Sequence, residues 1–323
     1  AKLVELLDFD QKTKNKAIRG AELCKNDLAT EMVNEFANLQ GVMGREYALL
    51  EGEDKETATA IFEHYLPRFA GDKLPQTKSG ITLSLAEKIF NLSSHFLLGN
   101  IPSGSQDPFA LRRQATGLLR IILDNSLKVN IDKMIKLSME IVAINLDNLD
   151  SADLELKGFI KQRLENLLAE EEVRYDIINA VIKVNDHDLF DVYQRAHKLM
   201  KFRSENSSLF VDLIRGLVRA KNISQKIENK LEIDAGLLVE DEEKELYKAF
   251  NQRKTKIKEL FSSKQYQKGF YLLVELKDYI DAFLDNVMVM VDDSKLKNNR
   301  LAILARISKL MSEVMDIEEI ALD

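Results

Sequence analysis

All four prolines of this chain lie within its first 108 residues, at positions 67, 75, 102 and 108. Because proline removes a backbone donor and clashes with the preceding turn, a long proline-free stretch is free to form long helices. Over residues 111–323, apolar side chains recur every three or four positions and strict alternation is nearly absent. Two such stripes are Leu154, Phe159, Ile160, Leu164, Leu167 and Leu168, and Leu301, Leu304, Ile307, Met311 and Val314. The pattern predicts amphipathic helices and an all-α fold.

The length of 323 residues exceeds the range in which a single hydrophobic core is usual. The polar run FRSENSS at 202–208 separates two strongly periodic segments, so we predict domains over residues 1–205 and 206–323. With 13 glycines and 4 prolines, the chain has too few turn-forming residues for a many-stranded sheet. A second polar run at 228–245 is expected to be a solvated loop within the second domain.

Charge and cysteine content restrict the class of protein. The net charge of −7 argues against a general nucleic-acid binder but leaves room for a local basic patch. Cys24 is the only cysteine, which favours a reducing, cytoplasmic compartment, and without a histidine in a supporting motif it is expected to fill the core. No run reaches the roughly 18 apolar residues of a membrane span. The first residues read as the interior of a helix, as expected of a chain cut from a longer polypeptide.

The stretch GNIPSGSQDPFALRRQATGLLRIILD, residues 99–124, predicts a helix that begins at Asp107 and Pro108, with the aspartate as cap and the proline at the first helical position. Arg113, Gly117 and Arg120 lie on one face of this helix. A glycine within a helix costs about 1 kcal/mol relative to alanine, so close approach of another group is expected there. Two groups fit, the phosphate of an RNA backbone or a packed helix with acidic residues. The apolar residues expected in the core are Phe109, Leu118, Leu119 and Ile122.

Basic and aromatic residues are interleaved in NQRKTKIKELFSSKQYQKGFY, residues 251–271. Cations hold phosphates and an exposed ring can stack on an unpaired base. The same residues also suit a helix with aromatic core positions and a solvated lysine face. The cations are Arg253, Lys254, Lys256, Lys258, Lys264 and Lys268, and the aromatic residues are Phe261, Tyr266, Phe270 and Tyr271.

A third basic stretch, SKLKNNRLAILARI at 294–307, carries Lys295, Lys297, Asn298, Asn299 and Arg300 before a periodic helix. An asparagine amide both donates and accepts, so it can read the edge of a base, whereas lysine supplies only charge. Asn298 is alternatively a helix cap. We expect base contacts at this end of the bundle.

Four blocks occur in one order, LCKNDLATEMVNEFANLQGVMGREYALLEGE (23–53), EHYLPRFAGDKLP (63–75), IPSGSQDPFALRR (101–113) and AFLDNVMVMVDDSKLKNNRLAILARI (282–307). Together they resemble the C-terminal half of the beta subunits of bacterial heterotetrameric glycyl-tRNA synthetases. The resemblance implies a helical domain similar to His-Asp (HD) phosphohydrolases, followed by a helical anticodon-binding domain. It also implies tRNA(Gly) and a catalytic alpha subunit as partners, in a tetramer of two alpha and two beta chains, with ATP and Mg bound only by the alpha subunit and no membrane contact.

An active HD site needs several histidine and aspartate ligands around a metal. Asn26 and Asp27 stand where the family pair is expected, and Glu87 where its distant aspartate is expected, so we predict a degenerate scaffold without metal or catalytic residues. The literal pair at 187–188 lies far from that position and predicts a solvated loop or cap. A metal-dependent phosphohydrolase using Asp27 and Glu87 is the alternative, with a protein-interaction scaffold as a third possibility.

The predicted tRNA-binding residues come from the three basic stretches. They are Arg112, Arg113, Arg120, Arg253, Lys254, Lys256, Lys258, Tyr266, Lys295, Lys297, Asn298, Asn299 and Arg300.

Overall fold

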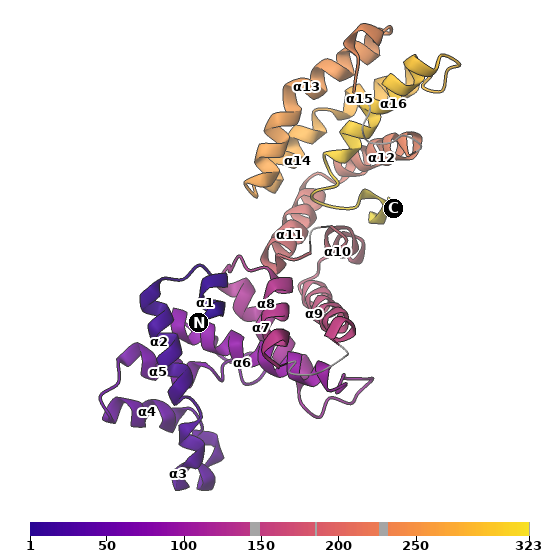
Figure 1. Ribbon diagram of the computed structural model, residues 1–323. Coiled ribbons are helices and arrows are strands. Elements are labelled where there is room, and N and C mark those ends of the chain that lie inside the picture. The colour runs from indigo at the N-terminus through magenta and orange to yellow at the C-terminus, as the bar shows by residue number, and fades with distance from the viewer. Residues whose placement is uncertain (143–148, 185, 226–231, 323) are drawn as a thin grey trace. The chain divides into compact units, whose positions relative to one another are not determined.

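The computed structural model describes residues 1–142, 149–184, 186–225 and 232–322, and within these ranges regular structure is helical, with two isolated β-bridges. The all-α prediction is confirmed (Figure 1). Within the described ranges, no helix has both the length and the apolar character needed to cross a membrane. The chain separates into two compact units, residues 1–167 with 187–190, and residues 168–186 with 191–323.

The N-terminal unit is built around a long helix, α6, which packs against α1, α2, α5, α7 and α8. Fully buried leucines at positions 85 and 92 of α6, and at 118 and 119 of α7, form part of its core. Its helices are α1 (Lys2–Leu6), α2 (Gln11–Leu23), η1 (Asn26–Ala29), α3 (Glu31–Glu35), η2 (Ala37–Leu39), α4 (Val42–Leu50), α5 (Lys55–Glu63), α6 (Lys78–Leu97), α7 (Leu111–Asp124), α8 (Ile131–Val142) and most of α9 (Leu149–Glu170).

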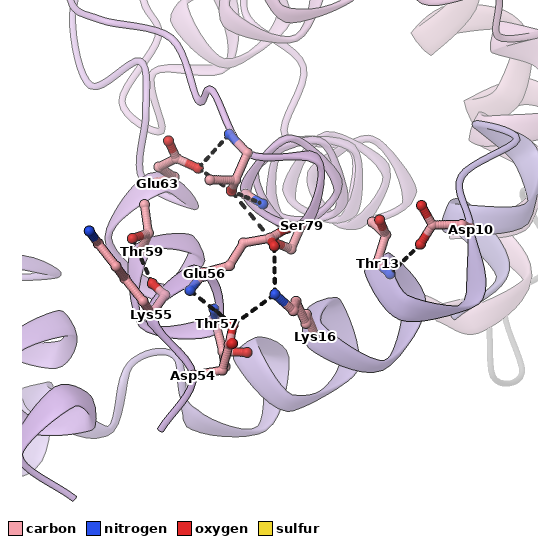
Figure 2. A network of polar contacts seen from close by, with 12 residues as sticks. Asp10, Thr13, Lys16, Asp54, Lys55, Glu56, Thr57, Thr59, Glu63 and Ser79 are labelled. Carbon is pink, nitrogen blue, oxygen red and sulfur yellow. Dashed lines mark hydrogen bonds and ion pairs between the residues drawn. The ribbon is translucent and has the colours of Figure 1, made fainter. Parts of the chain in front are cut away.

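A polar network joins α2, α5 and the start of α6 (Figure 2). Lys16 of α2 pairs with Asp54 at 2.9 Å and with Glu56 at 2.6 Å, in the cap and first turn of α5. Ser79 donates to the other oxygen of Glu56 at 3.1 Å. The buried carboxylate of Glu63 accepts the backbone amide of Thr77, the cap residue of α6, at 3.1 Å. These contacts fix both ends of α5 against its neighbours.

The C-terminal unit has a bundle in which α12 packs against α14, α15 and α16, and α13 against α14 and α15. Its helices are α10 (Tyr175–Ile182), α11 (Leu189–Glu205), α12 (Ser207–Ser224), η3 (Ala235–Leu237), α13 (Asp241–Ser262), α14 (Tyr266–Val274), α15 (Lys277–Asn286), α16 (Ser294–Lys309) and η4 (Ile317–Glu319). The last residues return to α10, where Ala321 donates its amide to Asp176 at 3.0 Å.

The division between units comes earlier than the predicted boundary at 205. Residues 168–186 and 191–205 group with the C-terminal unit. The reason is the buried guanidinium of Arg195 in α11, which donates to the carbonyl oxygens of Val181 at 2.9 Å and Val314 at 2.6 Å. Phe202 of α11 also packs against Phe210 of α12. The assignment of a function to each predicted domain stays a prediction.

The predicted core stripes hold except at Leu154 and at Phe159, which is half-buried. Leu301, Leu304 and Ile307 are buried, as are the last two members of that stripe, but Leu154 is 69% exposed and Leu156 takes the buried position instead. Of the polar run at 228–245, residues 228–231 lie outside the described residues, and residues 241–245 form the first turns of α13 rather than a loop.

Candidate nucleic-acid interface

The start of α7 differs from its sequence prediction by about one turn. Asp107 accepts the backbone amides of Leu111 at 2.8 Å and Arg112 at 3.0 Å, as a capping aspartate is expected to do. The helix nevertheless begins at Leu111, after Ala110 with φ at +53°, so Pro108 lies in the preceding turn and not at the first helical position.

Arg112 has a structural role at this point. Its guanidinium donates to the carbonyl oxygen of Gly104 at 2.7 Å and lies 3.4 Å from that of Gln106, which holds the preceding loop against the helix. Phe109, predicted in the core, is 45% exposed and stacks on the imidazole of His95 with centroids 4.2 Å apart. The other three apolar residues predicted for this core, at positions 118, 119 and 122, are fully buried.

The group that approaches Gly117 is part of the chain itself. A Cβ at this position would lie 2.9 Å from Cε of Lys88 and 3.2 Å from Cγ of Pro67. The expected close approach is thus made by packing within the chain, but its partners are a lysine stem and a proline and not a helix with acidic residues. Arg113 and Arg120 are exposed on either side, and Arg113 donates to the carbonyl oxygen of Arg68 at 3.3 Å. The face remains accessible to phosphate at its two cations.

The cations of α13 lie on its surface, whereas most of the aromatic residues beside them are core. Arg253 is bound to Glu275 at 2.9 Å and Lys254 to the side chain of Asn251 at 2.6 Å. Lys256 and Lys258 are exposed. Phe261, Tyr266 and Phe270 are buried, while Tyr271 is 44% exposed.

Tyr266 cannot stack on a base in this structure, because its ring is buried and its hydroxyl donates to Asp191 at 2.5 Å. The core alternative is therefore correct for this residue.

At the start of α16, two of the five predicted residues are buried. Asn299 accepts the amide of Asp234 at 2.8 Å and donates to the carbonyl oxygen of the same residue at 3.0 Å. The paired donor and acceptor that we expected on a base edge are thus used on the main chain of Asp234. Arg300 forms an ion pair with buried Glu243 and donates to the carbonyl oxygen of Met288 at 2.7 Å.

Three residues remain accessible at that helix start, Lys295, Lys297 and Asn298. The helix cap is Asp293, which accepts the amides of residues 295 and 296, so Asn298 is not the cap. The structure does not unite this group with the lysines of α13. Arg300 binds Glu243 in the first turn of α13, and Lys256 lies 13 residues further along, roughly 20 Å at the helical rise.

The segment before α16 exposes two residues that the sequence prediction missed. Val287 and Val289 are buried, whereas Met288 is 74% and Met290 59% exposed. The alternation V-M-V-M-V was the available signal, since alternating burial is typical of extended chain. These methionine side chains offer polarisable apolar surface close to Lys295 in sequence.

The two carboxylates of the degenerate HD position, Asp27 and Glu87, each have a structural contact, and Asn26 is exposed. Asp27 is buried and accepts the amides of Gly41 at 2.6 Å and Gly44 at 3.2 Å. Glu87 pairs with Lys25 at 2.8 Å. Burial alone would raise the pKa of Glu87, but the hydrogen bond and charge of Lys25 outweigh it and hold that pKa below its usual value.

His64 is 1% exposed, and its Nδ1 lies 2.5 Å from the carbonyl oxygen of Ile61, so Nδ1 carries the donated proton. Burial lowers the pKa of this imidazole and raises that of the Cys24 thiol. His64, Cys24 and Glu87 line a cavity of about 700 Å³ whose other walls are mostly apolar. Across the described ranges, no three histidine, cysteine, aspartate or glutamate side chains are grouped as metal ligands. The mostly apolar walls of the cavity suit a charged phosphoester poorly.

Of the other three histidines, the two in the N-terminal unit are half-buried at position 95 and exposed at position 187. His95 stacks on Phe109, and His187, of the literal His-Asp pair, lies 3.7 Å from Asp132 on the surface of the N-terminal unit.

Comparison with known proteins gives two family matches. Residues 1–183 match the family model of the glycyl-tRNA synthetase beta subunit, and residues 213–321 match that of the DALR anticodon binding domain. The glycine–tRNA ligase beta subunit of Halothermothrix orenii is 52% identical over 98% of this chain and 46% of its own length. Those of Clostridioides difficile and Halalkalibacterium halodurans are 40% and 36% identical, over 44% and 46% of their lengths. The chain therefore spans about half the length of the curated relatives it matches.

Proposed function

Since the chain belongs to the glycyl-tRNA synthetase beta-subunit family, we propose that it is the tRNA-recognition part of a glycine–tRNA ligase and binds tRNA(Gly), including its anticodon. The observation that carries the proposal is the anticodon-binding match over residues 213–321, the same residues whose helices expose the cations of α13 and α16. In this proposal the cations of each helix act as a local basic patch in a chain whose net charge is −7. A patch of this kind is what phosphate binding requires.

The two patches have different roles in the proposal. Lys295, Lys297 and Asn298 at the start of α16 contact the anticodon bases and their phosphates, together with the exposed side chains of Met288 and Met290. Asn298 is the member whose amide can discriminate between bases. Arg253, Lys254, Lys256 and Lys258 of α13 hold backbone phosphates, which contribute affinity without sequence preference. In the N-terminal unit, Arg113 and Arg120 act in the same way.

Chemistry belongs to the other subunit in this proposal. The alpha subunit carries aminoacylation with its ATP and Mg, in a cytoplasmic tetramer of two alpha and two beta chains. The HD-like residues act as scaffold, and we expect the isolated chain to hold no stoichiometric metal and to hydrolyse no phosphoester. Elemental analysis and a phosphatase assay measure this. Metal at one equivalent together with hydrolysis that is lost in Asp27→Ala would contradict it.

The test of recognition is a pair of binding titrations of this chain, with tRNA(Gly) and with a copy whose anticodon bases are substituted, over a series of salt concentrations. We expect tighter binding of tRNA(Gly) and a gap that narrows by about 1–3 kcal/mol in Asn298→Ala. The double variant Lys256→Ala/Lys258→Ala should weaken both RNAs equally and make the salt dependence shallower by about 0.7 per lost phosphate contact. Lys244→Ala, an exposed lysine on the first turns of the same helix, is the control. Equal affinity for both RNAs at every salt concentration would contradict anticodon recognition.

A further inference from the structure

The loop between α5 and α6 exposes a phenylalanine ring. Phe69 is 56% exposed, and residues 68, 70 and 71 beside it are exposed as well. An exposed phenylalanine leaves apolar surface in water, at a cost of roughly 25 cal/mol for each Å². The ring therefore gains from any partner that covers it.

This loop is held in shape by hydrogen bonds on both sides of the ring. One oxygen of Asp72 accepts the backbone amide of Arg68 at 2.9 Å and its guanidinium Nε at 3.0 Å, and the other accepts the amide of Lys73 at 2.9 Å. The amide of Asp72 in turn donates to the carbonyl oxygen of Phe69 at 3.2 Å. The turn at residues 69–72, which carries the ring, is thus held by hydrogen bonds on both sides of Phe69.

Helix α7 and helix α6 anchor the base of the loop. Arg113 of α7 donates to the carbonyl oxygen of Arg68, and Pro67 fills the space beside Gly117. Lys88 of α6 donates to the carbonyl oxygen of Leu66 at 2.9 Å. The glycine and arginine of the α7 face therefore serve to hold the loop that presents Phe69.

Cations border the ring. The guanidinium of Arg68 lies 5.9 Å from the centroid of Phe69 and 5.8 Å from that of Phe62, and Arg45 lies 5.3 Å from the Phe62 centroid. Lys73 is exposed on the far side of the turn. The adjacent carboxylate, Asp72, is only 7% exposed and is already engaged by Arg68. An exposed ring beside a guanidinium group fits a polyanion with π-faces, because aromatic rings and guanidinium planes both stack on bases.

We propose that Phe69 and Arg68 form a stacking platform for one unpaired base of the bound tRNA outside the anticodon, with Arg45 and Arg113 against the flanking phosphates. The platform rests on the proposed function, which supplies RNA as the ligand. The base lies outside the anticodon because the anticodon-binding match covers residues 213–321 and not this loop.

Fluorescence tests the platform directly, because the chain contains no tryptophan. In the Phe69→Trp variant the sole indole would stack on the base, so its emission should be quenched by tRNA(Gly) with the same midpoint as binding. The control is Phe90→Trp, another ring on the N-terminal unit that is 47% exposed, and its emission should not change. Circular dichroism establishes that both variants are folded.

Affinity supplies the second readout. Phe69→Ala should weaken binding about 5- to 150-fold for tRNA(Gly) and for the anticodon-substituted copy alike, with an unchanged salt slope, since a stacked ring releases no counterions. Phe69→Tyr should bind as the unaltered chain does. Unaltered affinity in Phe69→Ala, with no quenching in Phe69→Trp while the wild-type chain binds tRNA, would overturn the platform and leave the proposed function standing. Absence of RNA binding by the wild-type chain would overturn both.

Discussion

The two compact units differ in how they bury charge. In the C-terminal unit, buried guanidinium groups face buried carboxylates. Arg195 pairs with Asp191 at 3.0 Å, and Arg300 with Glu243, whose side chain is fully buried. Each arginine also donates to backbone carbonyl oxygens, so its donors are used within the fold.

In the N-terminal unit, buried ionisable groups have neutral hydrogen-bond partners. Lys88, which is 5% exposed, donates to the carbonyl oxygen of Leu66 and to the hydroxyl of Ser84. His64 uses one ring nitrogen on the carbonyl oxygen of Ile61, and its Nε2 has no partner among the described residues. Burial lowers the pKa of both groups, that of Lys88 to about 8.

This difference separates two uses of polar residues. Buried ion pairs fix the positions of helices in the C-terminal unit, so the recognition that we propose falls to side chains on its surface. In the N-terminal unit, by contrast, the buried Lys88 ammonium has no carboxylate among its hydrogen-bond partners and destabilises the fold as long as it keeps its charge. The contrast predicts opposite responses when the buried cation is removed from each unit.

The largest effect is expected for Arg300→Ala. It leaves the fully buried Glu243 without its cation, and loss of one partner of a buried pair costs about 3–5 kcal/mol. Urea unfolding monitored by circular dichroism measures the change. Lys297→Ala, one turn earlier on α16, is the control and should stay within about 0.5 kcal/mol. An Arg300→Ala protein of wild-type stability would contradict the structural role of the pair.

Lys88→Met should act in the direction opposite to Arg300→Ala, raising the free energy of unfolding, and by more at neutral than at alkaline pH. The folded state gives up this proton near pH 8 and the unfolded state near 10.5, so the unfolded state binds more protons between these values. The contribution of Lys88 therefore makes the wild-type chain gain stability as pH rises through this window, by at most about 3 kcal/mol.

The measurement for Lys88 is the difference in unfolding free energy between wild type and Lys88→Met at pH 7 and pH 10. This difference cancels the other groups that titrate in the window. The advantage of the variant should be greater at pH 7, and Lys55→Met, at an exposed site, should show no such change. A difference that is the same at both pH values would show that the buried ammonium is not destabilising.

A smaller effect is expected for Asn299→Ala. Loss of the two hydrogen bonds to the backbone N–H and C=O of Asp234 should cost about 1–2 kcal/mol of stability. The affinity gap between tRNA(Gly) and its anticodon-substituted copy should remain, because the amide is already engaged. If the gap narrows while unfolding stability is unchanged, Asn299 reads a base and the sequence prediction for this residue stands.

The sequence predicted the helical class and the family because proline positions, apolar spacing and long blocks are local properties. Which side chains are buried at the start of a helix depends instead on residues far away in the sequence. Nothing in KNNR distinguishes the half-buried Asn298 from the buried Asn299, because the difference depends on α13 and on Asp234, far away in the sequence. For the same reason, the sequence predicted a close contact at Gly117 but did not identify Pro67 and Lys88 as the residues that make it.

The prediction of exposed cations agreed with the structure more often than the prediction of exposed, base-stacking rings. Lysines such as 256 and 258 are exposed in α13 as a charged helix face requires, whereas Tyr266 is part of the core. Composition alone cannot separate a stacking ring from a core ring when both recur at helical spacing. The exposure of Phe69 depends on the turn that Asp72 closes, and the sequence did not predict it.

The most direct test of the account is the double variant Arg300→Met/Glu243→Met, which replaces the buried pair by apolar side chains. The account predicts stability close to wild type, since such replacements are often neutral or stabilising. It also predicts an unchanged affinity gap between tRNA(Gly) and its anticodon-substituted copy, measured by filter binding at fixed salt. A folded double variant that has lost the gap would contradict the account, because recognition would then reside in the buried pair.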